Sequence, residues 1–206
     1  MSANARSRGV AEPRVGVVGL QGAGEPHRAA FARLGVDARD VRSLHDLEGL
    51  THLVLPGGES TTLHHLLRLF GLWEEIGARH RAGELALFGT CAGAILLARH
   101  SGGKPPTLGV LDAVLERNAY GRQADSFVHE LTLAPELDDG SALRGVFIRA
   151  PRFTVLGPDV RVLARMGDDP VAVATAGCVA AAFHPELTLD TRFHSLFLRE
   201  HCLAVR

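Results

Sequence analysis

Short apolar runs alternate with longer amphipathic stretches through the first half of the chain. Runs of this kind indicate strands that are buried on both faces of a parallel sheet, and the amphipathic stretches between them indicate helices. Ser60 or Thr61 is expected to cap one of these helices at its amino end. The predicted strands cover residues 15–20, 36–41, 51–55 and 85–88, and the predicted helices cover 25–34, 63–70, 71–81 and 94–99, with a short helical link at 45–50.

The pattern changes after residue 106, where short strand-like runs are separated by turns. These runs predict antiparallel hairpins, and a run of small residues over 179–183 predicts a further core strand. A helix over 187–203 is expected to close the chain. The predicted hairpin strands cover residues 108–115, 127–133, 145–148, 154–156, 160–166 and 171–175.

Together these elements predict an α/β fold built as a three-layer sandwich. Its central sheet is expected to be mostly parallel with helices on both faces, and the second half of the chain is expected to add antiparallel strands. The chain has 206 residues and 46% hydrophobic content, so residues 14–206 are expected to form one domain with a sizeable core. Residues 1–13 are rich in Ser, Ala, Arg and Gly and are interpreted as a disordered extension.

Charge and cysteine usage narrow the classes of function. The 22 Lys and Arg residues nearly balance the 23 Asp and Glu residues, and no basic run predicts binding to nucleic acid. No apolar run approaches the roughly 20 residues that span a bilayer, and the first residues lack the apolar centre of a signal peptide. Cys91, Cys178 and Cys202 show no paired spacing, which favours a reducing compartment. The cytoplasm is therefore expected.

A candidate nucleophile lies in the segment Gly89-Thr90-Cys91-Ala92-Gly93, between a predicted strand and a predicted helix. Glycines on either side of a central nucleophile at such a turn are typical of a nucleophile elbow. The amino end of the following helix favours the thiolate of Cys91, and the N–H of Ala92 is placed to stabilise an oxyanion. The alternative is a buried structural cysteine in a tight turn. Cys178 and Cys202 are interpreted as packing residues.

A candidate base lies in His184-Pro185-Glu186, at the end of the small-residue strand. Proline biases His184 toward an extended conformation, in which residues two apart face the same way. Glu186 can then accept a hydrogen bond from one ring nitrogen and leave the other for a thiol. Taken alone, the segment would be an ordinary turn. The other ten histidines are interpreted mostly as surface or satisfied polar groups, and no metal site or cofactor is expected.

Two glycine-rich loops follow predicted strands. In the first, Gly19, Gly22 and Gly24 have the wrong spacing for a dinucleotide-binding fingerprint, so glycines of a tight turn are the simpler interpretation. In the second, Gly57 and Gly58 let the backbone approach a ligand with its N–H groups exposed. An ordinary strand-to-helix loop with a cap is the alternative for the second loop.

Residues 56–62, 89–93 and 184–186 resemble the motifs of the triad (class I) glutamine amidotransferases. Leu20-Gln21-Gly22 and the stretches 116–127 and 147–151 narrow the resemblance to the glutaminase subunits of pyridoxal 5′-phosphate synthases. The resemblance runs from about Arg14 to the end of the chain. It implies the class I glutamine amidotransferase fold.

The resemblance also implies a reaction. Cys91 attacks the side-chain amide of glutamine, His184 protonates the departing ammonia and then activates water, and Glu186 orients His184. Ammonia passes to a partner synthase subunit, a (β/α)8 barrel, which builds pyridoxal 5′-phosphate from a pentose phosphate and a triose phosphate. The implied oxyanion donors are the N–H groups of Gly58 and Ala92.

The residues that the resemblance implies for glutamine binding suit an amino acid. A carboxylate such as that of Glu59 matches the ammonium group, and a guanidinium matches the carboxylate. Arg122 could instead belong to an interface or to the structural framework. The implied glutamine-binding residues are Gly58, Glu59, Ser60, Arg122, Ile148 and Arg149.

Two other functions remain open at this point. One is a different cysteine-nucleophile amidohydrolase of the same elbow architecture, acting without a partner, although Gly58-Glu59-Ser60 and Arg122 suit an amino-acid substrate. The other is a nucleotide-binding or scaffold module with a spent site, against which the intact Cys91, His184 and Glu186 argue. Tyr120 stands where the family usually has phenylalanine, and the Gly/Pro-rich loop 22–26 leaves the affinity for the partner open.

Overall fold

A nine-stranded sheet forms the centre of the computed structural model, which describes residues 12–103, 105–117, 119 and 126–200. The strand order is β2-β1-β3-β4-β12-β11-β10-β7-β8, and the first five strands of that order pair in parallel. The other four pair antiparallel, as the hairpin pattern predicts. The strands are β1 (Val15–Val18), β2 (Arg39–Val41), β3 (His52–Leu55), β4 (Ala86–Thr90), β7 (Ser126–Leu133), β8 (Leu143–Ile148), β10 (Arg161–Met166), β11 (Asp169–Thr175) and β12 (Cys178–Ala181).

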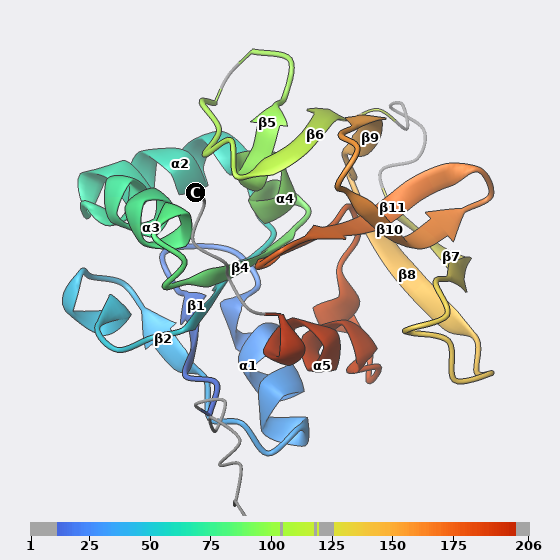
Figure 1. Ribbon diagram of the computed structural model, residues 1–206, viewed down its shortest axis with the longest axis horizontal. Coiled ribbons are helices and arrows are strands. Elements are labelled where there is room, and N and C mark those ends of the chain that lie inside the picture. Colours follow the sequence, from blue (N-terminus) through green and yellow to red (C-terminus); the bar gives the residue numbers. More distant parts are fainter. Residues whose placement is uncertain (1–11, 104, 118, 120–125, 201–206) are drawn as a thin grey trace, which may run out of the picture.

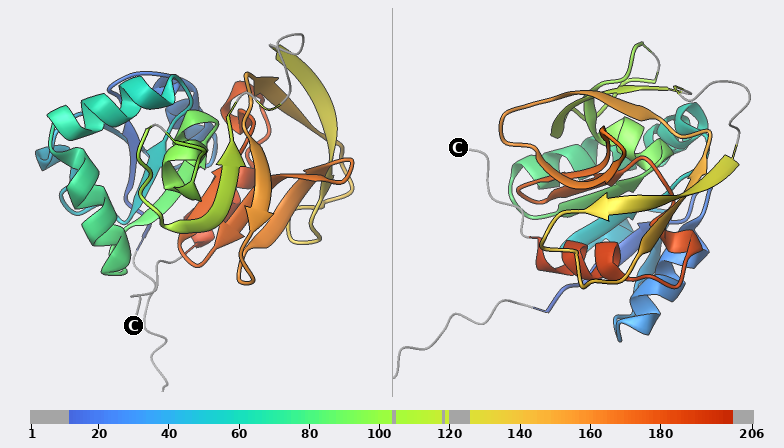
Figure 2. Two further views of the ribbon diagram at one scale, coloured as in Figure 1. Left: turned by 90° about the horizontal axis from the view of Figure 1, so that it is seen from above. Right: turned by 90° about the vertical axis from the view of Figure 1, so that its right-hand side faces the viewer.

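Helices cover both faces of the parallel half of this sheet (Figure 1). α1 (Gly24–Arg33) and α5 (Arg192–Arg199) lie on one face, and α2 (Ser60–Leu69), α3 (Leu72–Arg81) and α4 (Ala92–Leu97) lie on the other. Figure 2 shows the two helical layers on opposite sides of the strands. The predicted three-layer α/β fold is therefore confirmed.

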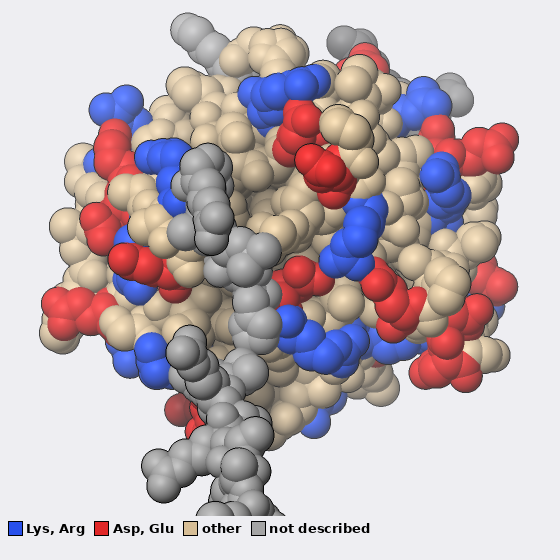
Figure 3. All heavy atoms as spheres, in the orientation of Figure 1, with Lys and Arg blue, Asp and Glu red and all other residues tan. Residues whose placement is uncertain are grey.

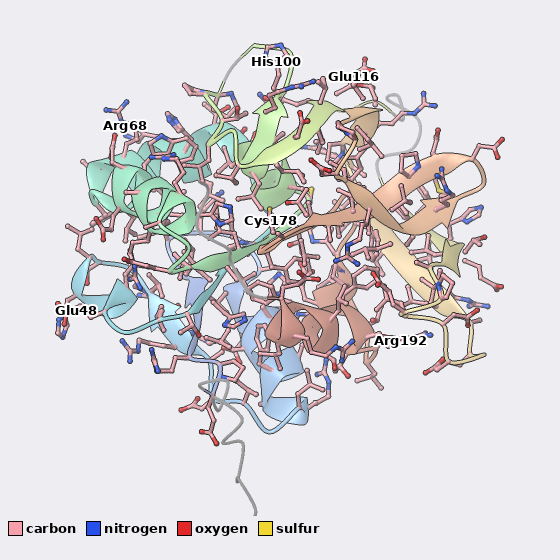
Figure 4. All side chains as sticks on the ribbon, in the orientation of Figure 1. Glu48, Arg68, His100, Glu116, Cys178 and Arg192 are labelled. Carbon is pink, nitrogen blue, oxygen red and sulfur yellow. The ribbon has the colours of Figure 1, made fainter. Side chains whose placement is uncertain are left out.

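The alternation of side chains along β4 divides the core between the two faces. Leu87 joins the apolar cluster under α2, α3 and α4, whereas Ala86 and Phe88 join the cluster under α1 and α5. Cys178 on β12 is fully buried in the first cluster and lies at the centre of the molecule (Figure 4). Its burial agrees with a packing role.

A second, three-stranded sheet has the order β5-β6-β9. It consists of β5 (Ala98–His100), β6 (Leu111–Glu116) and β9 (Arg152–Leu156). The helix predicted over 94–99 begins and ends two residues earlier, as α4. Ala98 already pairs with Leu111, and Arg99 contacts Asp112 at 2.6 Å, so this part of the chain belongs to β5.

The closing helix begins later than predicted. After β12 the chain forms a 3-10 turn, η2 (Pro185–Leu187), and α5 begins only at Arg192. Asp190 accepts the N–H of Arg192 at 2.9 Å, so the turn before the helix is held by its own side chains. A second 3-10 turn, η1 (His45–Leu47), stands at the predicted helical link. Residues 201–203 of the predicted helix lie outside the described residues.

Acidic and basic side chains are interspersed on the face shown in Figure 3, in line with the balanced composition. Within the described part of the chain, every helix is too short or too polar to cross a bilayer.

Candidate active site

Cys91 stands at the turn where β4 ends and α4 begins. Its backbone has φ 48° and ψ −103°, a positive φ that non-glycine residues rarely adopt. The flanking glycines are required by close approach: a Cβ at position 89 would lie 2.6 Å from the carbonyl carbon of Gly93, and one at position 93 would overlap the backbone of Leu55. The backbone at Cys91 is thus strained in the way that a nucleophile elbow requires.

His184 and Glu186 approach Cys91 from the end of β12. Nδ1 of His184 lies 2.7 Å from Oε1 of Glu186, and Cys91 is close enough to the same imidazole to be one of the groups that raise its pKa. The N–H of His184 donates to the carbonyl of Val146 on β8 at 2.8 Å. All three side chains of the predicted triad are therefore together, with Cys91 and His184 each about 6% exposed.

The predicted extended geometry of His184 and Glu186 is wrong. Pro185 occupies the first position of η2, where its fixed φ suits a 3-10 turn and its missing N–H leaves no donor unpaired. Leu187 donates its N–H to the carbonyl of His184 at 3.3 Å. The turn, and not the alternation of a strand, brings the carboxylate back to the imidazole.

The imidazole of His184 holds its proton strongly. Burial alone lowers its pKa, but hydrogen bonds to Cys91 and Glu186, together with the charges of both groups, outweigh burial and raise the pKa of His184 to about 10. His184 is therefore an imidazolium near neutral pH, hydrogen-bonded on one side to the carboxylate and close to the sulfur on the other.

The glycine loop after β3 lies against this pair. A Cβ at position 57 would overlap the imidazole of His184, and the N–H of Gly57 donates to Oγ1 of Thr90 at 3.1 Å. Gly58 has φ 147°, and a Cβ there would lie 2.9 Å from Nε2 of Gln21. Both glycines lie so close to a neighbouring side chain that a larger residue would displace that side chain.

Glu59 caps α2, contrary to the prediction that Ser60 or Thr61 does so. Its carboxylate accepts the N–H groups of Thr61 at 3.0 Å and Thr62 at 2.7 Å, and it lies 3.3 Å from the guanidinium of Arg117. Partial burial alone raises the pKa of Glu59, but these backbone hydrogen bonds outweigh it and lower the pKa to about 2. The side chain of Glu59 is long enough to reach the N–H groups of the first helical turn, so it caps α2 in place of the hydroxyl of Ser60 or Thr61.

The remaining predicted binding residues differ in their placement. Ser60 is buried, and its hydroxyl has no hydrogen-bond partner within the described residues. The carbonyl of Ile148 lies 3.7 Å from Sγ of Cys91, and Arg149 has a left-handed φ of 46°. Arg122 and Tyr120 lie outside the described residues.

Several of the histidines interpreted as surface or satisfied polar groups are buried. His80 bonds to the carbonyl of Leu85 and His52 to that of Glu200, so these two are the satisfied polar groups that were expected. His27 and His194 are different, because His27 lies 3.5 Å from Oε2 of Glu186. Neither histidine belongs to a sequence motif. The packing of α1 and α5 brings them to the site, so no signal in the sequence could have found them.

The structure has an α/β sheet with helices on both faces, and a cysteine, a histidine and a glutamate converge at its strand ends. This is the arrangement expected of a class I glutamine amidotransferase. The model of the SNO glutamine amidotransferase family matches residues 17–203, and the chain belongs to this family. The resemblance inferred from its motifs is confirmed.

Curated relatives are identical to this chain at about half of the aligned positions. The chain is 54% identical over 186 residues to the Thermus thermophilus protein called pyridoxal 5′-phosphate synthase subunit PdxT, covering 89% of this chain and 95% of the relative. A protein of the same name from Deinococcus radiodurans is 51% identical over 190 residues, with 89% and 95% covered.

Solved structures show the same fold. One described as a glutamine amidotransferase has a TM-score of 0.84 and 50% identity, and the match covers 89% of this chain and 96% of that one. PurLQS from Thermotoga maritima has a TM-score of 0.67 at 18% identity, covering 91% and 98%, and shows likeness in fold alone.

Proposed function

We propose that this protein hydrolyses L-glutamine to L-glutamate and ammonia through a thioester on Cys91. The observation that carries the proposal is the placement of His184 between Cys91 and Glu186, with a pKa of about 10. Membership of the SNO glutamine amidotransferase family, and likeness to the 50% identical solved structure described as a glutamine amidotransferase, support the same substrate.

In the first half of the reaction, the sulfur of Cys91 bonds to the amide carbon of the glutamine side chain. The N–H groups of Gly58 and Ala92 stabilise the oxyanion that forms on the carbonyl oxygen. His184 then gives its proton to the amide nitrogen, the C–N bond breaks, and ammonia leaves. Cys91 is left as a thioester and His184 as a neutral imidazole.

The second half reverses the role of His184. Acylation removes the charge of Cys91 and its hydrogen bond, which are two of the causes that raise the pKa of His184. The neutral imidazole takes a proton from water while the water oxygen bonds to the acyl carbon. The C–S bond breaks, glutamate is released, and the thiolate and imidazolium are restored.

Glutamine itself is held by Gly58, Glu59, Ser60, Arg122, Ile148 and Arg149 in this proposal. The ionised carboxylate of Glu59 supplies negative charge for the ammonium group, and its low pKa keeps that charge throughout the physiological range. The unpartnered hydroxyl of Ser60 is available to a polar group of the substrate.

The ammonia is proposed to pass to a synthase subunit that forms pyridoxal 5′-phosphate. The names of the relatives support a synthase partner, and the family resemblance supports a (β/α)8 barrel for it. We further propose that residues 14–206 act as one glutaminase domain in the cytoplasm, where buried free thiols such as Cys91 and Cys178 stay reduced.

Co-purification with the synthase subunit, combined with an assay for glutamine-dependent pyridoxal phosphate, tests the proposal. We expect ammonia release from glutamine that the synthase subunit stimulates. Cys91→Ala is expected to abolish release and still bind the partner. Equal turnover with and without the synthase would favour the alternative amidohydrolase that acts alone, and no turnover in either case would refute the glutaminase function.

A further inference from the structure

One oxygen of the Glu186 carboxylate has no hydrogen-bond partner within the described residues. Oε1 accepts the Nδ1–H of His184, whereas Oε2 is fully buried and unpaired, and the side chain as a whole is excluded from solvent. A buried carboxylate oxygen without a donor is strongly unfavourable. Nε2 of His27 lies 3.5 Å from this oxygen.

His27 comes from α1 and is fully buried, and it approaches Oε2 of Glu186 whereas His184 contacts Oε1. Its Nε2 lies 3.1 Å from Oγ1 of Thr90, the residue before the nucleophile, and its Nδ1 lies 2.9 Å from Nε2 of His194 on α5. The imidazole is therefore held at both nitrogens, between the elbow strand and the last helix.

Both of these histidines are neutral in the folded protein. Burial lowers the pKa of His27 well below 6.5, and repulsion between its protonated form and protonated His194 or the charged His184 adds to the effect. The pKa of His194 is lowered to about 3, mainly by burial and also by the charge of Arg33, with the charge of Asp190 opposing. Each ring thus carries a single N–H, and the bond between the two rings has one donor and one acceptor.

The surroundings select one of the two possible arrangements. If His27 donated from Nδ1, its Nε2 lone pair would face the negative Oε2 of Glu186, and Nδ1–H of His194 would be a buried donor without a partner. If His194 donates instead, Nε2–H of His27 donates to Oγ1 of Thr90 and lies beside Oε2 of Glu186, with 3.5 Å between Nε2 and that oxygen. Within the described residues, the group of this pair that then stays unpaired is a lone pair of His194. Orphaned N–H groups are rarer in proteins than orphaned acceptors.

We propose that His27 is a positioning residue of the glutaminase site: its Nε2–H, fixed by His194, steers the free oxygen of Glu186 and so aims the carboxylate at Nδ1 of His184. The inference rests on the proposed function. Its consequence is that His184 keeps the orientation and the proton that the departing ammonia requires. Without His27, Oε2 of the buried carboxylate loses the N–H dipole that lies 3.5 Å from it, and the carboxylate holds the imidazolium less well.

Two substitutions at position 27 separate this role from packing. His27→Leu removes the N–H and keeps a side chain of similar bulk, whereas His27→Gln can place an amide N–H near the former Nε2. His80→Leu is the matched control, because His80 is also a buried helical histidine and it bonds to a backbone carbonyl away from the site.

Steady-state glutaminase kinetics of each variant in complex with the synthase subunit provide the readout. We expect His27→Leu to lower kcat about 10- to 100-fold with little change in KM for glutamine, and His27→Gln to recover much of the loss. The alkaline limb of kcat/KM, where His184 loses its proton, should move to lower pH in His27→Leu alone. A folded His27→Leu enzyme with unchanged kcat and an unmoved limb would overturn the proposal.

NMR of the wild-type protein labelled with 15N-histidine tests the tautomer without relying on turnover. We expect His27 to be protonated at Nε2 and not at Nδ1. The opposite tautomer would overturn the proposal even if the enzyme hydrolyses glutamine. A wild-type complex without glutamine turnover would instead refute the proposed function and leave the tautomer result to decide the role of His27 toward Glu186.

Discussion

Gly57 lies against the imidazole of His184 so closely that a Cβ at position 57 would overlap Cε1 and come 2.9 Å from Nδ1. The glycine loop and the imidazole are therefore positioned together, although they come from β3 and β12. Any side chain at position 57 must displace the ring from Cys91 or from Glu186.

Gly57→Ala is accordingly expected to reduce glutamine turnover. A displacement of about 1 Å at a reacting group is enough to lower kcat roughly 100-fold. Kinetics of the complex with the synthase subunit measure the loss. Gly35→Ala serves as the control, since an added Cβ there meets nothing within 4 Å. Its left-handed backbone should cost about 1 kcal/mol of stability and no activity. Wild-type kcat in Gly57→Ala would show that the ring position is not critical.

The strained backbone at Cys91 gives a prediction about stability. Cys91→Ala and Cys91→Gly both remove the thiol and should lower turnover by about 10⁴-fold or more. Glycine relieves the positive φ of 48° whereas alanine keeps it, so the glycine variant should be the more stable by about 1 kcal/mol. Urea unfolding of both variants measures the difference.

Cys178 supplies the comparison for that experiment. It lies in β12 with no positive φ, so glycine there should be less stable than alanine by about 1 kcal/mol. The same order of stability at positions 91 and 178 would contradict the assignment of backbone strain to the nucleophile.

Local pattern was enough to predict the elbow and most elements of the fold. Cys91 and its two glycines stand in a segment whose geometry follows from residue type, because only glycine fits where the helix passes close to the strand. The apolar runs that became β3 and β4 are likewise explicit in the sequence. The convergence of Cys91 with His184 could be inferred because both follow strands of one parallel sheet.

What the sequence could not supply depends on contacts between distant elements. The extended form expected of His184-Pro185-Glu186 gave way to a turn because proline suits either conformation, and the contacts of Val146 and Leu187 with His184 decide between them. The role of Glu59 as a cap was missed because hydroxyl residues follow it directly. His27 carries no motif, and only the packing of α1 and α5 brings it to Glu186.

The carboxylate of Glu59 caps α2 and is proposed to bind the ammonium group of glutamine. A substitution at this position can separate the two roles. Glu59→Gln keeps an oxygen that can accept from Thr61 or Thr62 but loses the negative charge. We expect a loss of stability of about 1 kcal/mol or less and a KM for glutamine that rises about tenfold or more, because the ammonium loses its partner. Unfolding curves and glutaminase kinetics measure the two effects.

Asp46 is the matched control for Glu59. Its carboxylate accepts the N–H groups of Arg42 and Ser43 at 3.0 and 2.8 Å in a turn of its own. Asp46→Asn should therefore lower stability by a comparable amount with KM unchanged. An unchanged KM in Glu59→Gln would remove Glu59 from the glutamine-binding residues and leave it as a cap alone.

Stability should depend on acid pH through the two buried histidines. His194, with a pKa of about 3, and His27, whose pKa is also well below 6.5, stay neutral when folded, whereas the unfolded chain binds protons at both below about pH 6.5. Their contribution to the free energy of unfolding is complete above that pH and is lost as the pH falls toward 3. The expected slope is about 1.4 kcal/mol per pH unit for each histidine.

The raised pKa of His184 makes the free energy of unfolding change with pH in the opposite direction. The effect of His184 can therefore be separated from that of the two buried histidines. Its pKa is raised to about 10, so its contribution is present below about pH 6.5 and disappears as the pH rises through 10. Urea unfolding between about pH 4 and 6.5, below the range in which the contribution of His184 changes, therefore reports the buried pair. His194→Phe, placed among Phe31 and Phe88, should lose part of the acid dependence, whereas substitution of the exposed His45 by alanine should not. A wild-type stability that stays level from pH 7 to pH 4 would contradict the neutral pair on which the orientation of His27 depends.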